Sequence, residues 1–340
     1  MHSVLWTPSR PILLGTVALT LYFSVPVRTG SAADAAACKK IPVILDTDIG
    51  DDIDDTWALA LLLRSPELDL KLVVGDKQKG TYRAKLLARI LEIAGRTDVP
   101  VGVANGERQG IGRQQPWVEG YDLNSYPGVV HNDGVQAIID TIMGSQVPVT
   151  LIAIGPLTNL REALRREPRI AEKARFVGMQ GSVFKGYNNR PKASPEYNVR
   201  ADVPACQAVF TAAWKMTITP LDTCGIVRLR GEKYAQVRDC QDPLVAALIE
   251  NYRIWRKEGK GLPDKREEAS STLYDTVAIY LAFANDLCKM ETLPIRVTDG
   301  GMTVVDQGAK KMQVATEWKD LGAFEDLLVK RLVGSENDSK

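Results

Sequence analysis

The sequence from Ile41 to Leu63 reads IPVILDTDIGDDIDDTWALALLL, with six aspartates between two apolar segments. The acidic part, residues 46–55, contains one glycine and no lysine or arginine. Carboxylates so close together raise one another's pKa and repel, unless a cation offsets them or water separates them. The apolar segments on both sides favour burial, so separation by water alone does not account for so many neighbouring carboxylates. The stretch therefore predicts a buried strand, an acidic turn and a helix.

The alternation of strand and helix continues along the chain. Short apolar runs predict strands at 41–46, 70–75, 99–104, 149–154, 175–179 and 216–220. Segments with a helical period predict helices at 54–64, 81–94, 134–143, 158–166 and 203–211. We therefore expect a single α/β domain on a mainly parallel, Rossmann-like sheet with helices on both faces. Long polar stretches are predicted to be loops over the C-terminal strand ends, at 106–130, 182–200 and 258–270.

The first residues of the chain have a different character. Residues 11–27 are almost wholly apolar, and small residues follow them. This pattern predicts a cleaved signal peptide at 1–32, a mature domain at 33–340, and a secreted or periplasmic location. Pro26 and Arg28 interrupt the apolar character, which argues against a retained membrane anchor.

The charge, histidine and cysteine contents exclude several functions. Without residues 1–32 the chain has 41 basic and 42 acidic residues, so nothing in it attracts nucleic acid or an anionic membrane. Of two histidines, His2 leaves with the predicted signal peptide and only His131 remains, which excludes zinc sites built on several histidines. The five cysteines allow one or two disulfides, with buried thiols as the alternative.

The acidic turn offers oxygen ligands only, which favours calcium or magnesium over zinc or copper. An EF-hand loop starting at Asp46 is excluded, because its sixth position is Asp51 instead of glycine and its twelfth is Trp57 instead of glutamate. A phosphatase with an aspartate nucleophile fits Asp46 and Asp48 in outline. However, Gly50 stands where such enzymes carry a hydroxyl residue.

The acidic stretch resembles the N-terminal signature of the calcium-dependent nucleoside hydrolases, the inosine-uridine preferring family. That signature is D-x-D-x-G-x-D-D-x-x-A, and this chain has two extra residues before the final aspartate pair. Other segments recur in the family's order: VVGD (73–76), AIGPLTN (153–159), VGMQGS (177–182), PEYNVRAD (195–202), TPLDTCG (219–225) and a late helix with an aspartate. Residues 117–134 look closest to exported members.

The chemistry of N-glycosidic cleavage agrees with this resemblance. The reaction builds positive charge on the ribose and negative charge on the departing base. It needs a water nucleophile, carboxylates near the sugar, and a proton or hydrogen bond for the base. A calcium ion can hold the water and the ribose hydroxyls together and lower the water's pKa. We therefore expect an exported nucleoside N-ribohydrolase with one Ca²⁺ ion that releases ribose and free base.

The resemblance implies roles for individual residues. Asp48 would bind calcium and accept the water's proton, Asp55 and Asp275 would bind calcium, and the backbone carbonyl of Ile154 would complete the site. The residues implied in ribose binding are Asp54, Asp76, Met179, Asn189, Glu196 and Asn198. The two extra residues leave the register open, so that Asp51 or Asp52 could take the place of one of the later aspartates.

The sequence departs from the family at the leaving group. Tyr274 stands where some members carry a histidine proposed to protonate the base, so His131 is the one imidazole left to act as the catalytic acid. Two other functions remain open, namely a hydrolase of another ribosyl or glycosyl compound on the same scaffold, and a non-catalytic, calcium-dependent nucleoside or sugar-binding protein. The base preference and a homo-oligomeric state also remain open.

Overall fold

The computed structural model describes residues 1–8, 39–76, 78–104, 112–258 and 268–334. The chain forms two compact units, Met1–Cys38 and Lys39–Lys340. Most of the first unit lies outside the described residues, so the signal peptide and its cleavage remain predictions. Within the described residues, no helix has the length and apolar character needed to cross a membrane.

A ten-stranded sheet organises the second unit, in the order β4-β3-β2-β1-β5-β6-β7-β10-β8-β9. Its strands are β1 (Ile41–Thr47), β2 (Leu68–Gly75), β3 (Val101–Gly102), β4 (Val130–His131), β5 (Val149–Ala153), β6 (Ala174–Met179), β7 (Lys215–Thr219), β8 (Cys288–Val297), β9 (Thr303–Val305) and β10 (Lys311–Trp318). The first seven strands pair in parallel, and β10 is parallel to β7. The predicted α/β fold with a mainly parallel sheet is therefore confirmed.

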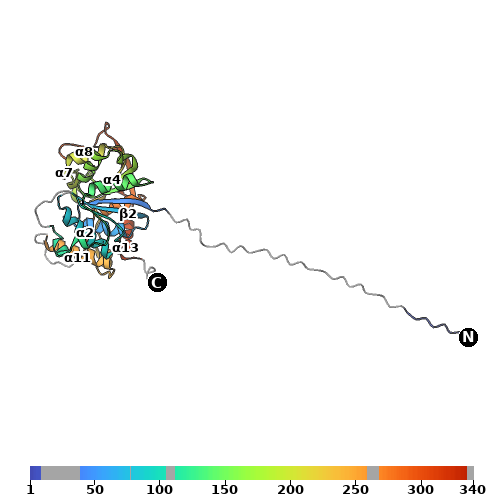
Figure 1. Ribbon diagram of the computed structural model, residues 1–340. Helices are drawn as coiled ribbons and strands as arrows, with labels where there is room; N and C mark the ends of the chain where they lie inside the picture. The colour runs from blue at the N-terminus through green and yellow to red at the C-terminus, as the bar shows by residue number, and fades with distance from the viewer. Residues whose placement is uncertain (9–38, 77, 105–111, 259–267, 335–340) are drawn as a thin grey trace. The chain divides into compact units, whose positions relative to one another are not determined.

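Helices cover both faces of the sheet and bury two apolar cores (Figure 1). One core involves α1, α2, α11, α12 and α13, and the other involves α4, α5 and α8. The helices are α1 (Asp54–Leu63), α2 (Gly80–Ile93), α3 (Gln115–Val118), α4 (Gly134–Gly144), α5 (Thr158–Arg166), α6 (Ile170–Lys173), α7 (Tyr197–Ala201), α8 (Val203–Thr211), α9 (Leu221–Cys224), α10 (Gly231–Arg238), α11 (Pro243–Glu258), α12 (Thr276–Phe283) and α13 (Leu321–Val333). Two 3₁₀ turns are η1 (Leu123–Ser125) and η2 (Tyr187–Asn189).

The strand order reverses at β1, and this reversal positions the site. From β1 the chain adds β2, β3 and β4 on one side, then returns to place β5, β6 and β7 on the other. In an open α/β sheet, ligands bind outside the carboxyl ends of the strands at such a switch point. The crevice should therefore lie where β1 and β5 end, at the acidic stretch and at the glycine-proline turn after β5.

The C-terminal part of the sheet differs from the sequence-based expectation. Strand β8 is antiparallel to β10, and β9 is antiparallel to β8. These strands expose one face, and in β10 buried and exposed residues alternate over part of its length. A search for continuous apolar runs misses such strands, because half-exposed antiparallel strands alternate in polarity.

The predicted loops contain short regular elements, and the described cysteines are free thiols. The predicted loops contain short elements, namely α3, η1 and β4 in the first and η2 and the start of α7 in the second. The third is partly outside the described residues. The cysteines at 206, 224, 240 and 288 are free thiols, and Cys38 lies outside the described residues.

Candidate active site

The acidic stretch forms the loop between β1 and α1. Because α1 begins at Asp54, both Asp54 and Asp55 lie in its first turn, where the helix dipole favours carboxylates. Gly50 has a φ of 104°, a conformation that residues with a side chain rarely adopt. The hydroxyl of Tyr82 on α2 donates to the Gly50 carbonyl oxygen at 3.0 Å. This turn therefore requires its glycine, and α2 holds it in place.

A buried arginine on α2 holds the rest of the loop. Arg83, only 3% exposed, donates to the backbone carbonyl oxygens of Asp48 and Ile49 and, at 2.9 Å, to the Asp51 carboxylate. Lys79 also contacts Asp51, at 2.6 Å. Burial alone would raise the pKa of Asp51, but Arg83 and Lys79 lower it below its ordinary value. Asp51 is thus an anchor of the loop.

Three buried aspartates from distant parts of the sequence meet beside this loop. Carboxylate oxygens of Asp54, Asp55 and Asp275 all lie within 4.8 Å of one another. Asp275 directly precedes α12, and its backbone N–H donates to Asp54 at 3.4 Å across a separation of 221 positions. The hydroxyl of Thr47 donates to Asp55. The structure therefore groups Asp54 with Asp55 and Asp275, whereas the resemblance implied that Asp48 would be their partner and that Asp54 would hold the ribose.

The electrostatics of this triplet favour a cation. Burial raises the pKa of Asp54, Asp55 and Asp275 well above the ordinary value, and neighbouring aspartates raise it further. Burial also raises the pKa of Asp48, to about 6, although Arg83 opposes the change. A set of buried carboxylate oxygens matches the ligands that hard divalent cations prefer. The residues present therefore fit such an ion, whose identity the donor set leaves between calcium and magnesium.

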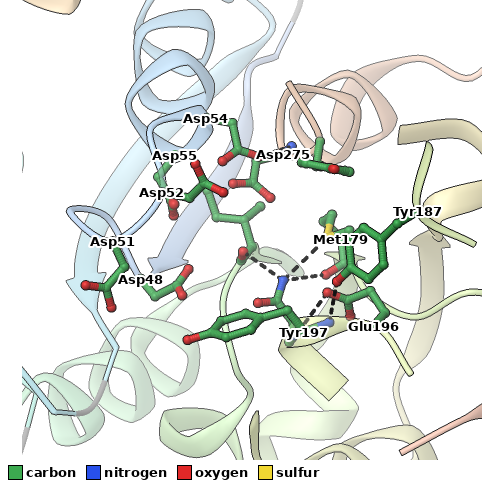
Figure 2. A pocket seen from close by; sticks show the side chains of 13 residues that line it. Asp48, Asp51, Asp52, Asp54, Asp55, Met179, Tyr187, Glu196, Tyr197 and Asp275 are labelled. Carbon is green, nitrogen blue, oxygen red and sulfur yellow. Dashed lines mark hydrogen bonds between the residues drawn. The ribbon is translucent and has the colours of Figure 1, made fainter. Parts of the chain in front are cut away.

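The triplet lines a cavity of about 330 Å³ at the carboxyl ends of the central strands (Figure 2). The cavity brings together the predicted site residues Asp48, Asp54, Asp55, Ile154, Met179, Glu196, Asn198, Tyr274 and Asp275. It is also lined by Asp51, Asp52, Tyr187 and Tyr197. Most of the implied site therefore converges, although more than 200 positions separate its first and last members.

One wall of the cavity is formed by residues at the start of α7. Glu196 is buried and accepts hydrogen bonds from the backbone N–H groups of Gly181 at 3.0 Å and Asn198 at 2.7 Å. Burial raises the pKa of Glu196 to about 7, while these N–H groups oppose the change. The Asn198 amide nitrogen lies 3.1 Å from the carbonyl oxygens of both Ile154 and Met179. These bonds fix the orientation of the Asn198 amide.

The sequence analysis named Tyr274 but missed two other tyrosines that line the cavity, Tyr187 and Tyr197. The rings of Tyr187 and Tyr274 meet edge to face, with centroids 6.3 Å apart. The Tyr187 hydroxyl accepts a hydrogen bond from the backbone N–H of Tyr197 at 2.8 Å, and Tyr197 is itself 48% exposed. Tyr197 stands between Glu196 and Asn198 in the PEYNVRAD segment, and Tyr187 lies earlier in the predicted 182–200 loop, so these positions were the available signal.

Three predicted residues lie elsewhere. His131 is exposed on β4, which pairs with β3 at the edge of the sheet, and it is not among the residues lining the cavity. Asn189 is exposed in η2, with a φ of 58°. Asp76 is buried directly after β2, and its backbone N–H donates to the Thr47 carbonyl oxygen at 2.7 Å. None of these three residues is among those that line the cavity, so their roles stay predictions.

Several known proteins are similar to this chain in sequence or in fold. Uridine nucleosidase 1 of Arabidopsis thaliana is 28% identical over 301 residues, which cover 82% of this chain and 86% of that protein. The inosine-uridine preferring nucleoside hydrolase of Leishmania major is 30% identical over 285 residues, covering 78% and 87%. A solved plant nucleoside hydrolase superposes with a TM-score of 0.71 at 24% identity, covering 87% of this chain and 100% of that one.

Residues 43–326 match the family described as inosine-uridine preferring nucleoside hydrolase. The chain belongs to this family. It is therefore an N-glycosyl hydrolase of the nucleoside hydrolase type, acting on ribonucleosides.

The buried triplet predicts that a divalent cation stabilises the protein more strongly as the pH rises. The ordinary pKa of aspartate is about 4, and the raised values mean that the folded chain binds more protons than the unfolded chain above that pH. Without a cation, the free energy of unfolding therefore falls with rising pH. Because a cation replaces those protons, millimolar calcium should raise the Tm more at about pH 8 than at about pH 5.

Thermal unfolding with and without calcium at the two pH values measures this effect. Asp275→Asn should lose most of the stabilisation, because it removes one charged ligand. Asp140→Asn should keep it, since Asp140 is exposed on α4, which packs against the other core. Equal Tm shifts at both pH values would contradict the proposed role of the triplet.

Proposed function

We propose that this chain is an exported nucleoside N-ribohydrolase that cleaves the N-glycosidic bond of ribonucleosides with the help of one calcium ion. The observation that carries the proposal is the triplet of Asp54, Asp55 and Asp275 in the same cavity as Glu196 and Asn198 (Figure 2). The triplet offers oxygen ligands to a cation. The other pair offers hydrogen-bonding groups to a sugar.

Asp48 is suited to accept a proton from the attacking water. When bound, calcium would act as a Lewis acid that holds the water and the ribose hydroxyls and lowers the water's pKa. The pKa of Asp48 is raised by burial to about 6, so its carboxylate is mostly deprotonated at neutral pH and is a stronger base than an ordinary aspartate. Arg83 donates a hydrogen bond to the Asp48 backbone carbonyl oxygen. Its positive charge stabilises the Asp48 carboxylate and so limits the rise of its pKa.

Glu196 and Asn198 would orient the ribose. Backbone N–H donors fix the Glu196 carboxylate: Oε2 accepts from Gly181 and Val199, whereas Oε1 accepts from Asn198 alone and keeps a lone pair for a ribose hydroxyl. The Asn198 nitrogen is held by two carbonyl oxygens, so its own oxygen is directed to accept a second hydroxyl. Met179, buried beside the Asn198 amide, would pack against the sugar ring.

The hydrolysis balances without further reactants. The water oxygen bonds to the anomeric carbon, and the carbon–nitrogen bond breaks with its electron pair passing to the base. Asp48 takes one proton from the water, and the base gains one proton from solvent or a neighbouring donor. The products are ribose and the free base.

We propose export because an apolar segment with a small-residue exit precedes the folded unit. The mature chain should begin between about residues 31 and 38. N-terminal sequencing of the protein secreted by its native host measures this. Recovery of the full-length chain with its Met1 intact would contradict cleavage.

Ribose release from a panel of nucleosides tests the activity. The mature protein with calcium should release ribose from at least one ribonucleoside, and a strong chelator should abolish the release. Asp275→Ala should lower turnover by about 10²-fold or more, because the cation's electrostatic support is lost. Release from another ribosyl or glycosyl compound, with none from nucleosides, would favour the alternative substrate class, and full activity under chelation would refute the cation's role.

The position of His131 predicts that its imidazole is dispensable. General acid assistance contributes about 10²–10⁴-fold to a rate, so a catalytic His131 would be costly to remove. Since His131 is exposed at the sheet edge, we expect His131→Ala to keep kcat/KM within about twofold on natural nucleosides. Steady-state kinetics on inosine and uridine decide the point. A loss on natural nucleosides that vanishes on a nitrophenyl riboside would restore His131 as the acid.

A further inference from the structure

A second cavity, of about 520 Å³, adjoins the first. Asp52 and Tyr274 line both cavities, so the two are neighbours on either side of these residues. The other charged residues that line the second cavity are Arg228, Arg256 and Glu268. The acidic end of the first cavity suits the ribose, so the base of a bound nucleoside would extend towards the tyrosine that the cavities share.

The wall of the second cavity is attached to the acidic loop. The Trp255 indole N–H donates to the Asp51 carbonyl oxygen at 3.2 Å. One face of this indole stacks on Tyr252, with centroids 6.1 Å apart, and the Arg113 guanidinium lies 3.8 Å from its ring centroid. These contacts hold the ring in place at the wall of the second cavity.

The chain directs the Arg228 side chain into this second cavity. The backbone of Val227 and Leu229 pairs with residues 270–273, through Leu273 N–H to Val227 O at 2.9 Å and Ser270 N–H to Leu229 O at 3.0 Å. Val227 and Leu229 are fully buried in the core, so the residue between them faces the opposite way. Arg228 is half-buried, and its guanidinium donates to the Thr272 hydroxyl at 3.0 Å.

Thr272 connects this arginine to the active site. Thr272 lies two residues before Tyr274, which lines both cavities, and three residues before Asp275 of the triplet. Within the described residues, the bond to Thr272 uses one of the five N–H donors of the guanidinium. The planar group is therefore oriented and still has donors for a ligand.

We infer that Arg228 binds the carbonyl oxygen of the departing base and selects nucleosides whose base carries that oxygen. The inference rests on the proposed function and names the substrate class for the same site. As the carbon–nitrogen bond breaks, its electron pair passes to the base, and a keto base delocalises the charge onto its carbonyl oxygen. A guanidinium remains charged at all physiological pH values, so it stabilises this anion without giving up a proton.

The same group discriminates against amino bases. Arginine carries donors only, so it pairs with the oxygen of uracil or hypoxanthine but meets another donor in the amino group of cytosine or adenine. A site built to bind one group rejects the analogue that lacks it, because its buried polar atoms stay unpaired. Inosine and adenosine differ only in this group, which makes them a matched pair of substrates.

The test measures kcat/KM for inosine and adenosine in the calcium-loaded mature enzyme. The wild type should prefer inosine. Arg228→Met, which keeps the stem and removes every donor, should lose about 10²-fold on inosine and much less on adenosine. On a nitrophenyl riboside, whose leaving group is already good, the loss should be small. Arg230→Met removes the same charge from an exposed position two residues away, outside the residues that line either cavity, and should leave the preference unchanged.

Folding and the proposed function are checked separately. Arg228→Lys keeps the charge but not the planar fork, so its preference for inosine should fall between those of the wild type and Arg228→Met. The Tm of each variant shows whether it has a folding defect. If Arg228→Met has one, the inosine-to-adenosine preference of Arg228→Lys tests the inference in its place. An unchanged inosine-to-adenosine ratio in both variants, or equal losses on both nucleosides, would overturn the role of Arg228. A wild type that releases ribose from no nucleoside would instead refute the proposed function.

Discussion

The repulsion among buried carboxylates is the constraint on which the rest of this structure depends. Asp54, Asp55 and Asp275 bring their oxygens within 4.8 Å of one another in a buried setting, where like charges are costly. A cation or bound protons must offset them. Two helix starts position the triplet: the first turn of α1 carries two of its members, and the residue directly before α12 supplies the third.

The protein supplies part of the compensation from behind the loop. Arg83 is buried, yet its charge is balanced by the surrounding aspartates, and its hydrogen bonds to two backbone carbonyls fix the loop's path. Its hydrogen bonds go to Asp51 and to backbone carbonyl oxygens, and its charge also lowers the pKa of Asp55. The aspartates of the loop therefore differ in role: Asp51 anchors the loop while it lines the cavity, and Asp54 and Asp55 belong to the triplet.

The leaving-group side of the site is built from different chemistry. Tyr187, Tyr197 and Tyr274 line the first cavity, and burial raises the pKa of Tyr274 to about 12, which makes it a hydrogen-bond donor more than an acid. No histidine lines either cavity among the described residues. Assistance to the base by a permanently charged guanidinium fits this setting better than proton transfer from an imidazole.

The sequence by itself determined the parallel α/β core and the identity of most cavity residues. Apolar runs, helical periods and glycine turns are local signals, and the polar motifs at strand ends meet because parallel strands end at one edge. Only the tertiary structure decided which aspartates touch, that Asp51 binds Arg83, that His131 lies on an edge strand, and that β8 and β9 run antiparallel. These outcomes depend on packing between segments far apart in the chain, as with the 221 positions between Asp54 and Asp275, and no local pattern encodes such a pairing.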